Sequence, residues 1–320
     1  MIEFDPRADI TLKVGREKKL FSACSRALSR TSPVFERMLY GHFTESKTRL
    51  AEGEGEEWVV ELPEDEPAPM EIFLNISHGH FGRVPKKMPL DELYELTVLS
   101  NYYDCTRMLE PWINGWMASI NVKDSSVGMA KALWVSWEFG RKEAFSRMAL
   151  RMLMESDMGR MDEDEFDKLK MPPDIIERIS AIRLQTIQAL LGVLRDLVEN
   201  LLVVDEKPRW CRHAEWMGPH RCESMILGSM TFCLARAGLW PLPTVEEVLD
   251  SIVGLHRKMT GLVIHDIGHV GGKHALDHQL CNPGPLLMGQ IEEIFKDVAS
   301  PVTKFHLERM DEQAKRLTEA

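Results

Sequence analysis

The side chains that could bind a metal are concentrated in one stretch of the chain. Seven of the eleven His and four of the six Cys lie between residues 211 and 281. Cys211 and Cys222 flank a loop, and His278 and Cys281 are three residues apart, on one face of their segment if it is helical. Three thiolates and one imidazole form a closed tetrahedral ligand set for zinc. The spacing therefore predicts a structural zinc ion held by Cys211, Cys222, His278 and Cys281.

A second interpretation of this cluster stays open, because Cys is also among the residue types most often buried in ordinary cores. Cys211 and Cys222 are further apart than the two to four intervening residues usual in zinc modules. If one of the four is not a ligand, the substitutes are His213, His220 and His274. A metal here would join the break at residues 205–219 to the segment before Leu286, so its binding energy would become folding energy.

The same stretch holds a motif for a different chemistry. Residues 264–269 read Ile-His-Asp-Ile-Gly-His and resemble the HD signature of metal-dependent phosphohydrolases, in which adjacent His and Asp hold an ion that activates water. That family spreads its other ligands over several helices, whereas His256 and Asp277 are close to His265 in sequence. The plain alternative is a polar loop punctuated by glycines. Phosphate-binding loops, nucleophile elbows and H-E-x-x-H motifs are absent, so we predict no catalysis.

Length and charge limit the class of protein. A chain of 320 residues suggests two domains, and 39 Lys and Arg against 50 Asp and Glu give a net charge of −11. Residues 1–118 carry −6 and residues 119–320 carry −5, so neither half offers the basic surface that nucleic acids or anionic membranes require. No uncharged run approaches the ~18 residues of a membrane span, and no signal sequence is visible. We expect a soluble protein of the cytoplasm or nucleus, with reduced thiols.

The elements that must position these residues fall into two groups. Alternating apolar residues at Ile10–Val14 predict a strand, and Gly15-Arg16 a turn into a second strand at Leu20-Phe21. Two short helices follow, the second capped by Ser32 with Pro33 in its first turn. Trp58–Leu62 reads as another strand, and residues 72–76 and 90–109 as helices. The first third is therefore α+β.

After about residue 118 the pattern is helical. A long helix opens after Pro172-Pro173, and Ile187, Leu190, Leu194, Leu197 and Leu201 recur at alternating spacings of three and four. This run covers barely two heptads, so a long core helix is preferred to a coiled coil. Further helical patterns cover residues 223–234, 245–259 and 286 to the end.

With this order of elements, residues 5–118 resemble a BTB/POZ domain. The resemblance is carried by Asp9–Gly15, Phe21–Leu28, Ser32-Pro33-Val34-Phe35 and Phe43-Thr44-Glu45, with later helices at Leu74–His78 and Leu93–Leu109. Pro111-Trp112, Trp116, Leu133–Gly140, Leu227–Met230 and Gly238–Pro241 resemble the helical region of fungal BTB proteins that lack kelch or zinc-finger partners.

The resemblance implies protein-protein contact. BTB domains form homodimers, and many dock a cullin scaffold of ubiquitin ligases while others recruit corepressors. In cullin-docking members a hydrophobic residue stands two before a glutamate after the third helix, and Phe43 and Glu45 resemble that pair. A Phe in a groove supplies desolvated area and a Glu supplies directional bonds. The alternative places Phe43 in the core. Cys24-Ser25 departs from the pair linked to corepressor pockets, and the short N-terminus leaves dimerisation open.

Together these patterns predict an α+β BTB/POZ-like domain at residues 1–118, followed by an all-α domain at 119–320 stapled by zinc around 205–285. The expected function is a non-catalytic interaction module, an adaptor between a cullin scaffold and a client protein. The alternatives are a homo-oligomeric scaffold or a transcription-associated regulator, and then the HD-type hydrolase.

Overall fold

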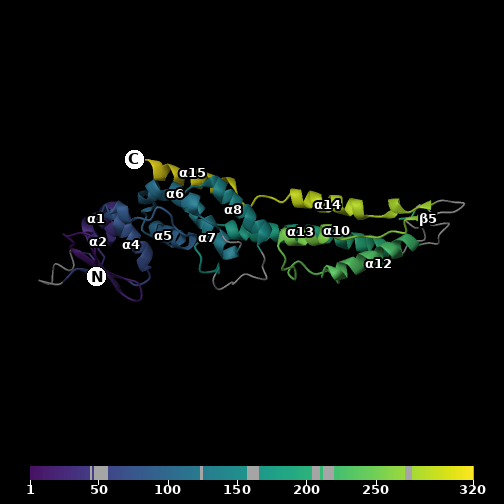
Figure 1. Cartoon of the computed structure of the whole chain (residues 1–320), viewed down its shortest axis with the longest axis horizontal. Helices are drawn as coiled ribbons and strands as arrows, with labels where there is room; N and C mark the ends of the chain where they lie inside the picture. The colour runs from purple at the N-terminus through teal and green to yellow at the C-terminus, as the bar shows by residue number, and fades with distance from the viewer. Residues whose placement is uncertain are drawn as a thin grey trace. The chain divides into compact units, whose positions relative to one another are not determined.

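The computed structural model describes residues 1–43, 45–46, 57–122, 125–156, 166–203, 210–211, 220–270 and 276–319. They form two compact units (Figure 1). The described residues of unit 1 come from Met1–Ala149, Glu163–Pro173 and Val302–Ala320, and those of unit 2 from Leu150–Asp162 and Asp174–Pro301.

A four-stranded sheet in the order β1-β3-β2-β4 lies in unit 1. The predicted hairpin is confirmed, since β2 (Ile10–Val14) pairs antiparallel with β3 (Lys19–Ala23). β4 (Val59–Leu62) adds parallel to β2, with Leu12 opposite Val60, and the short β1 (Ile2–Glu3) adds parallel to β3. Both Leu12 and Val60 are buried. The sheet thus joins strands that are distant in sequence.

Four helices of unit 1 follow the predicted order: α1 (Ser25–Thr31), α2 (Pro33–Tyr40), α4 (Pro67–Ser77) and α5 (Leu90–Tyr102). Ser32 caps α2 as expected, since its hydroxyl accepts from the Phe35 N–H at 3.1 Å. The Phe35 ring stacks on Tyr103 at 4.4 Å between ring centres. This stack belongs to the core cluster that includes Leu12, Phe21 and Val60.

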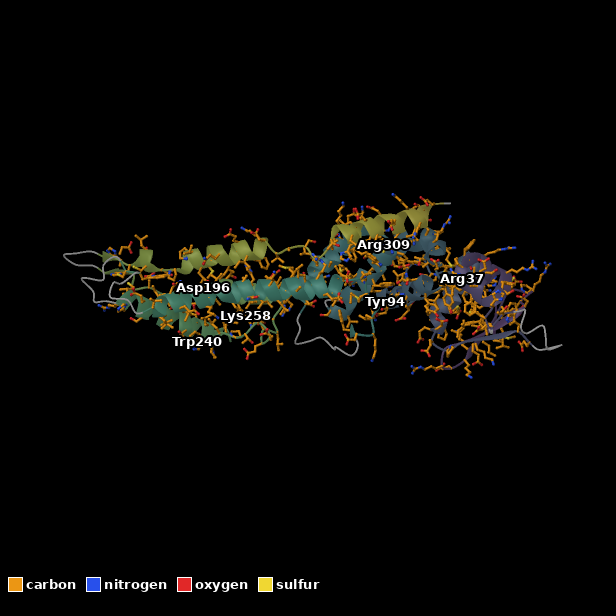
Figure 2. All side chains as sticks on the ribbon, turned by 180° about the vertical axis from the view of Figure 1, so that it is seen from behind. Arg37, Tyr94, Asp196, Trp240, Lys258 and Arg309 are labelled. Atoms are coloured by element: carbon orange, nitrogen blue, oxygen red, sulfur yellow. The ribbon has the colours of Figure 1, made fainter. Side chains whose placement is uncertain are left out.

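Unit 1 also contains elements beyond residue 118. The turn η2 (Thr106–Leu109) leads to α6 (Glu110–Ser119), and α7 (Ser126–Glu138) packs on α5. Tyr94 of α5 is buried, and its hydroxyl accepts from the Lys170 N–H at 2.6 Å (Figure 2). α15 (Lys304–Thr318) returns to α7. Gly140, with φ +62°, meets it so closely that a Cβ would lie 2.9 Å from the Met310 carbonyl oxygen.

This packing divides the chain differently from a boundary at residue 118. α7 buries most of its residues, Leu133, Trp134 and Val135 among them. Because they pack with unit 1, the helical sequence pattern that begins near residue 119 does not start a separate compact body. The boundary at 118 stays a prediction for the limit of the BTB-like fold itself.

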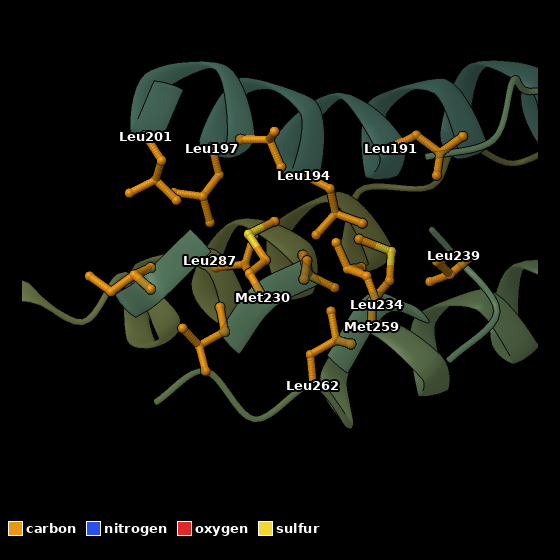
Figure 3. Close-up of a cluster of buried hydrophobic side chains, with 14 of the residues drawn as sticks. Leu191, Leu194, Leu197, Leu201, Met230, Leu234, Leu239, Met259, Leu262 and Leu287 are labelled. Carbon is orange, nitrogen blue, oxygen red and sulfur yellow. The ribbon is translucent and has the colours of Figure 1, made fainter. Parts of the chain in front are cut away.

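Unit 2 is built on α10 (Ile175–Leu202), with α12 (Arg221–Arg236), α13 (Ile252–Thr260) and α14 (Gly284–Lys296) packed against it. The apolar residues repeated along α10 are buried in one cluster with Met230, Leu234 and Met259 (Figure 3). α10 is therefore the core helix of unit 2, as predicted from a heptad pattern too short for a coiled coil. α8 (Lys142–Glu155) is the helix at which the chain leaves unit 1.

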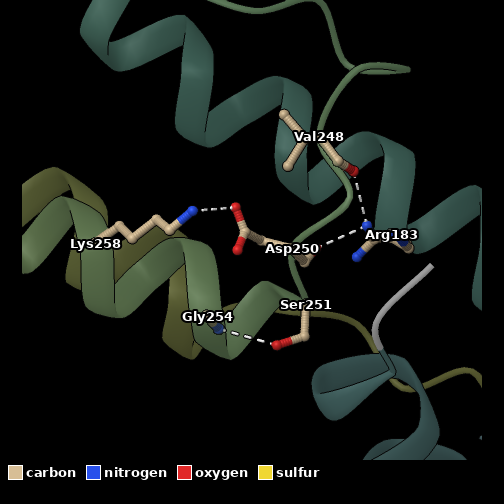
Figure 4. Close-up of polar contacts among 6 residues, drawn as sticks. All are labelled: Arg183, Val248, Asp250, Ser251, Gly254 and Lys258. Atoms are coloured by element: carbon tan, nitrogen blue, oxygen red, sulfur yellow. Dashed lines mark hydrogen bonds and ion pairs between the residues drawn. The ribbon is translucent and has the colours of Figure 1, made fainter. Parts of the chain in front are cut away.

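Three local features that follow α12 in the sequence differ from the predicted pattern. α13 begins at Ile252, because the preceding residues cross α10, where Arg183 donates to the carbonyls of Val248 and Asp250 at 3.0 and 2.8 Å (Figure 4). A two-residue hairpin, β5 (His269–Val270) with β6 (Leu276–Asp277), precedes the turn η4 (Gln279–Cys281). The predicted C-terminal helix is two helices, α14 and α15.

None of the helices in the described part of the chain combines the length and apolar character that a membrane crossing requires.

Candidate metal centre and interaction loop

The structure brings the four predicted metal ligands together in unit 2. The sulfur atoms of Cys211, Cys222 and Cys281 and a ring nitrogen of His278 all lie within 4.8 Å of one another, and all four side chains are buried. The Nδ1 atom of His278 lies 3.5 Å from the Cys211 Sγ and 3.2 Å from the Cys222 Sγ. Four ligand atoms from a stretch that runs from Cys211 to Cys281 thus converge on one point.

Local structure explains how each ligand reaches that point. Cys222 is the second residue of α12, and Cys211 follows the end of α10. His278 precedes the 3₁₀ turn that ends at Cys281, and residues three apart eclipse each other in such a turn. The His278 N–H donates to the Gly268 carbonyl at 3.0 Å, which ties the turn to the hairpin. The Trp210 indole donates to the Cys281 carbonyl.

Electrostatics make this arrangement unusual for plain thiols. Burial raises the pKa of the Cys222 thiol, and the neighbouring thiols of Cys211 and Cys281 raise it further. The Cys222 thiol therefore resists ionisation by itself. A divalent cation reverses this, because it deprotonates coordinating thiols outright. The donor set of three sulfurs and one imidazole suits zinc.

Other candidates of the Cys and His cluster lie elsewhere. His220 immediately precedes α12 and is exposed, and Cys233 donates to the Val263 carbonyl at 2.9 Å, away from the cluster. Neither belongs to the group of converging ligand atoms. The substitutes His213 and His274 lie outside the described residues.

The HD motif has a local structural role. One carboxylate oxygen of Asp266 accepts from the Gly268 N–H at 2.6 Å, and the other accepts from the Asn282 side chain at 2.9 Å. His265 is exposed. Among the described residues, the group of ligand atoms that could hold a metal includes neither of them. The motif fixes a turn at Gly268, which matches the polar-loop interpretation.

The predicted contact loop follows α2. Phe43 is 55% exposed, although Phe side chains are usually buried. Glu45 is half-buried, and its backbone carbonyl accepts from the Trp58 indole at 2.9 Å. This bond anchors the loop to the residue that precedes β4. Thr44 lies outside the described residues. The loop thus presents a large apolar side chain to solvent from an anchored backbone.

The sequence patterns did not indicate one buried carboxylate, that of Glu138. Glu138 ends α7 in unit 1 and is 3% exposed. Its oxygens accept from Thr106 at 2.5 Å and from Asn101 at 3.0 Å. Burial raises its pKa to about 7, against the effect of these two hydrogen bonds. Nothing in the sequence around Trp134–Gly140 distinguishes it from a solvated charge at a helix end.

The fold of unit 1 therefore defines an α+β domain in which a small sheet is covered by helices. Residues 3–110 match the family model of the BTB/POZ domain. Residues 3–110 are accordingly a BTB/POZ domain, a protein-interaction module of a generally non-catalytic kind. No curated protein matches the chain.

Proposed function

We propose that this protein is an adaptor, in which the BTB/POZ domain docks a cullin-type scaffold through Phe43 and Glu45 and the helical region holds a client protein. The observation that carries the proposal is the 55% exposure of Phe43 on an anchored loop. A large side chain that fills a desolvated pocket of the partner is the kind of anchor on which binding hot spots are built. The BTB/POZ match supports the general role of the domain in protein contact.

A pull-down with purified cullin tests the docking surface. Phe43→Ala with Glu45→Ala removes the apolar anchor and its neighbouring carboxylate, and we expect binding to fall by at least about tenfold, since loss of a hot-spot residue costs about 2 kcal/mol or more. The backbone bond from Trp58 to residue 45 does not depend on either side chain.

Phe81→Ala is the matched control. Phe81 is 59% exposed in the same unit, so its replacement removes similar exposed apolar area at another place. The Phe81→Ala variant should bind cullin at the wild-type level. Absence of cullin binding by the wild type, or an equal loss in the control, would contradict the proposal.

We further propose that Cys211, Cys222, His278 and Cys281 hold a structural zinc ion. Tetrahedral zinc with Zn–S near 2.3 Å and Zn–N near 2.05 Å requires sulfur and nitrogen ligands about 3.6 Å apart. The distances from the His278 Nδ1 to the two sulfurs, 3.5 and 3.2 Å, support this arrangement. The ion would tie the segments around residues 211 and 280 to the start of α12.

Elemental analysis of the purified chain tests this site. We expect about one zinc ion per chain, lost in Cys222→Ser and in Cys281→Ser because a structural site is closed by four ligands. Cys233→Ser is the control, since Cys233 lies in the same unit outside the cluster. A chain without metal, or a zinc content that Cys222→Ser leaves unchanged, contradicts the site.

A further inference from the structure

Unit 2 carries a groove between α10 and α14 with a volume of about 520 Å³. The two helices run side by side in Figure 1. α10 lines the groove with residues at helical spacing, from Ile182 through Thr186 and Ala189 to Val193, and α14 contributes Gln290 and Ile294. At 1.5 Å per residue, the stretch from Ile182 to Val193 is about 16 Å long.

The face of α10 beside the groove is unusual for a solvent-exposed helix. Its outward residues over three turns carry no charge, in a chain of which 28% is charged. They are Ala181, Leu184, Gln185, Gln188, Ala189 and Gly192. Gly192 lies inside a helix, where glycine costs about 1 kcal/mol relative to alanine, yet a Cβ there would meet no atom of the described residues within 4 Å. Packing among the described residues therefore does not explain this glycine, and the missing side chain leaves room for the close approach of an outside helix.

The charges at the groove identify the occupant. Among the described residues that line it, the charged ones are Glu293 and Asp297, both exposed on the α14 side. A second copy of this chain docked by the same face would bring the acidic rims of both copies into one interface, which like-charge repulsion disfavours. A partner with basic residues complements the rim.

The size of the groove fits a short helix. A cavity of about 150 Å³ accepts a benzene-sized group, so 520 Å³ has room for about three large side chains. Apolar residues at i, i+4 and i+7 of an amphipathic helix supply three anchors within about 11 Å, shorter than the groove.

We propose that the groove between α10 and α14 binds an amphipathic helix of a partner protein, with three apolar anchors flanked by Lys or Arg. The inference rests on the proposed adaptor function, since it assigns the client to this groove. Phe43 and Glu45 belong to unit 1, so cullin docking and helix binding can fail separately.

The test uses a fluorescent 18-residue designed helix with Leu at i, i+4 and i+7 and Lys on its flanks, titrated with the full chain at low salt. Binding of the Lys helix to the wild type is expected, and Glu293→Lys with Asp297→Lys should weaken it by about tenfold. A helix with Glu in place of Lys should bind the variant with both replacements more tightly than the wild type. Glu199→Lys with Glu246→Lys makes the same charge change outside the groove and should leave binding within about twofold.

Ala189→Trp fills the groove from an exposed position, so it should abolish binding of both helices while the circular dichroism spectrum stays unchanged. Equal binding of the Lys and Glu helices to the wild type overturns the proposal. So does an undiminished affinity of Ala189→Trp. A wild-type dimer in light scattering that Ala189→Trp converts to a monomer would identify a second copy as the occupant, and it also overturns the proposal.

Discussion

Glu138 shows how a single buried group makes stability depend on pH. Its carboxylate is surrounded by neutral donors from three elements: Thr106 of η2, Asn101 of α5 and, at 3.5 Å, Gln313 of α15. The positive charge of Lys170, which contacts the Asn101 side chain, lowers the pKa of Glu138, and the negative charge of Asp104 raises it. Desolvation exceeds these effects, so the folded chain binds the proton more tightly than the unfolded chain.

The sign of the effect follows from the two pKa values, about 7 in the folded chain and an ordinary value of 4.5. Between them the folded state carries more protons, so stability from this group is complete below pH 4.5 and is lost as pH rises to about 7. At 1.36 kcal/mol per pKa unit the loss is about 3 kcal/mol. Glu138→Gln removes this contribution, and its free energy of unfolding should fall less than that of the wild type between pH 5 and 8.

Urea unfolding at four pH values measures the difference between the two proteins. Glu92→Gln, which neutralises an exposed carboxylate of α5, serves as the matched control and should follow the wild type. Parallel curves for wild type and Glu138→Gln would contradict the assignment of a proton to this site.

The junction of α1 and α2 shows how one side chain serves two elements. The Ser32 hydroxyl accepts from the Phe35 N–H and donates to the Tyr103 carbonyl at 2.6 Å. It thereby joins the cap of α2 to the residue that ends α5, beneath the stacked rings of Phe35 and Tyr103. Ser32 is fully buried, so water cannot replace either bond.

We expect Ser32→Ala to lower the free energy of unfolding by about 2–3 kcal/mol, because it removes a helix cap and leaves a buried carbonyl without its donor. Ser125→Ala provides the comparison. Ser125 caps α7 through the Gly128 N–H at 3.1 Å but is exposed, so its loss should cost about 1 kcal/mol. Equal losses in denaturant titrations would show that the bond to Tyr103 contributes nothing.

Local patterns were sufficient for most elements. The hairpin at Ile10–Val14 and the Ser32 cap follow from turn and capping chemistry that acts over a few residues. The heptad pattern of α10 is too short for a coiled coil, and this favoured the core helix that the structure shows. The start of α13 could not be predicted, because Arg183, distant in sequence, holds the preceding backbone.

Composition indicated the metal cluster, but its geometry depends on tertiary structure. The clustering of Cys and His pointed to Cys211, Cys222, His278 and Cys281, and no spacing rule could show that the hairpin carries His278 to the two other cysteines. No local sequence pattern indicated the buried Glu138 or the groove between α10 and α14. Both depend on which helices pack together, and this information is not contained in a window of ten residues.

At the scale of the molecule, the two units differ in what stabilises them. Unit 1 has a four-stranded sheet and an aromatic core, whereas the core of unit 2 is formed mainly by helices packed against α10. The proposed zinc ion would therefore contribute to unit 2 alone, as binding energy that becomes folding energy.

Chelation of the metal should show this difference in hydrogen exchange. We expect amides of residues 220–236 and 276–281 to lose protection by at least about tenfold, because binding stabilises only the folded state. Amides of β2, β3 and α5 should keep theirs. Cys222→Ser should give the same pattern without chelator, and Cys233→Ser should respond as the wild type does. An equal loss of protection in both units would contradict a zinc site confined to unit 2.

The contact between Gly140 and α15 has a consequence for how the protein is made. The helix that covers α7 lies in sequence after the whole of unit 2. At about 5–20 residues per second, the ribosome needs roughly 10–30 s to translate from Gly140 to α15. During that time the nascent chain has the sheet of unit 1 but lacks its last helix. The end of α7, including Glu138, then lacks its contacts with α15, and the packing of unit 1 is completed only after α15 has been made.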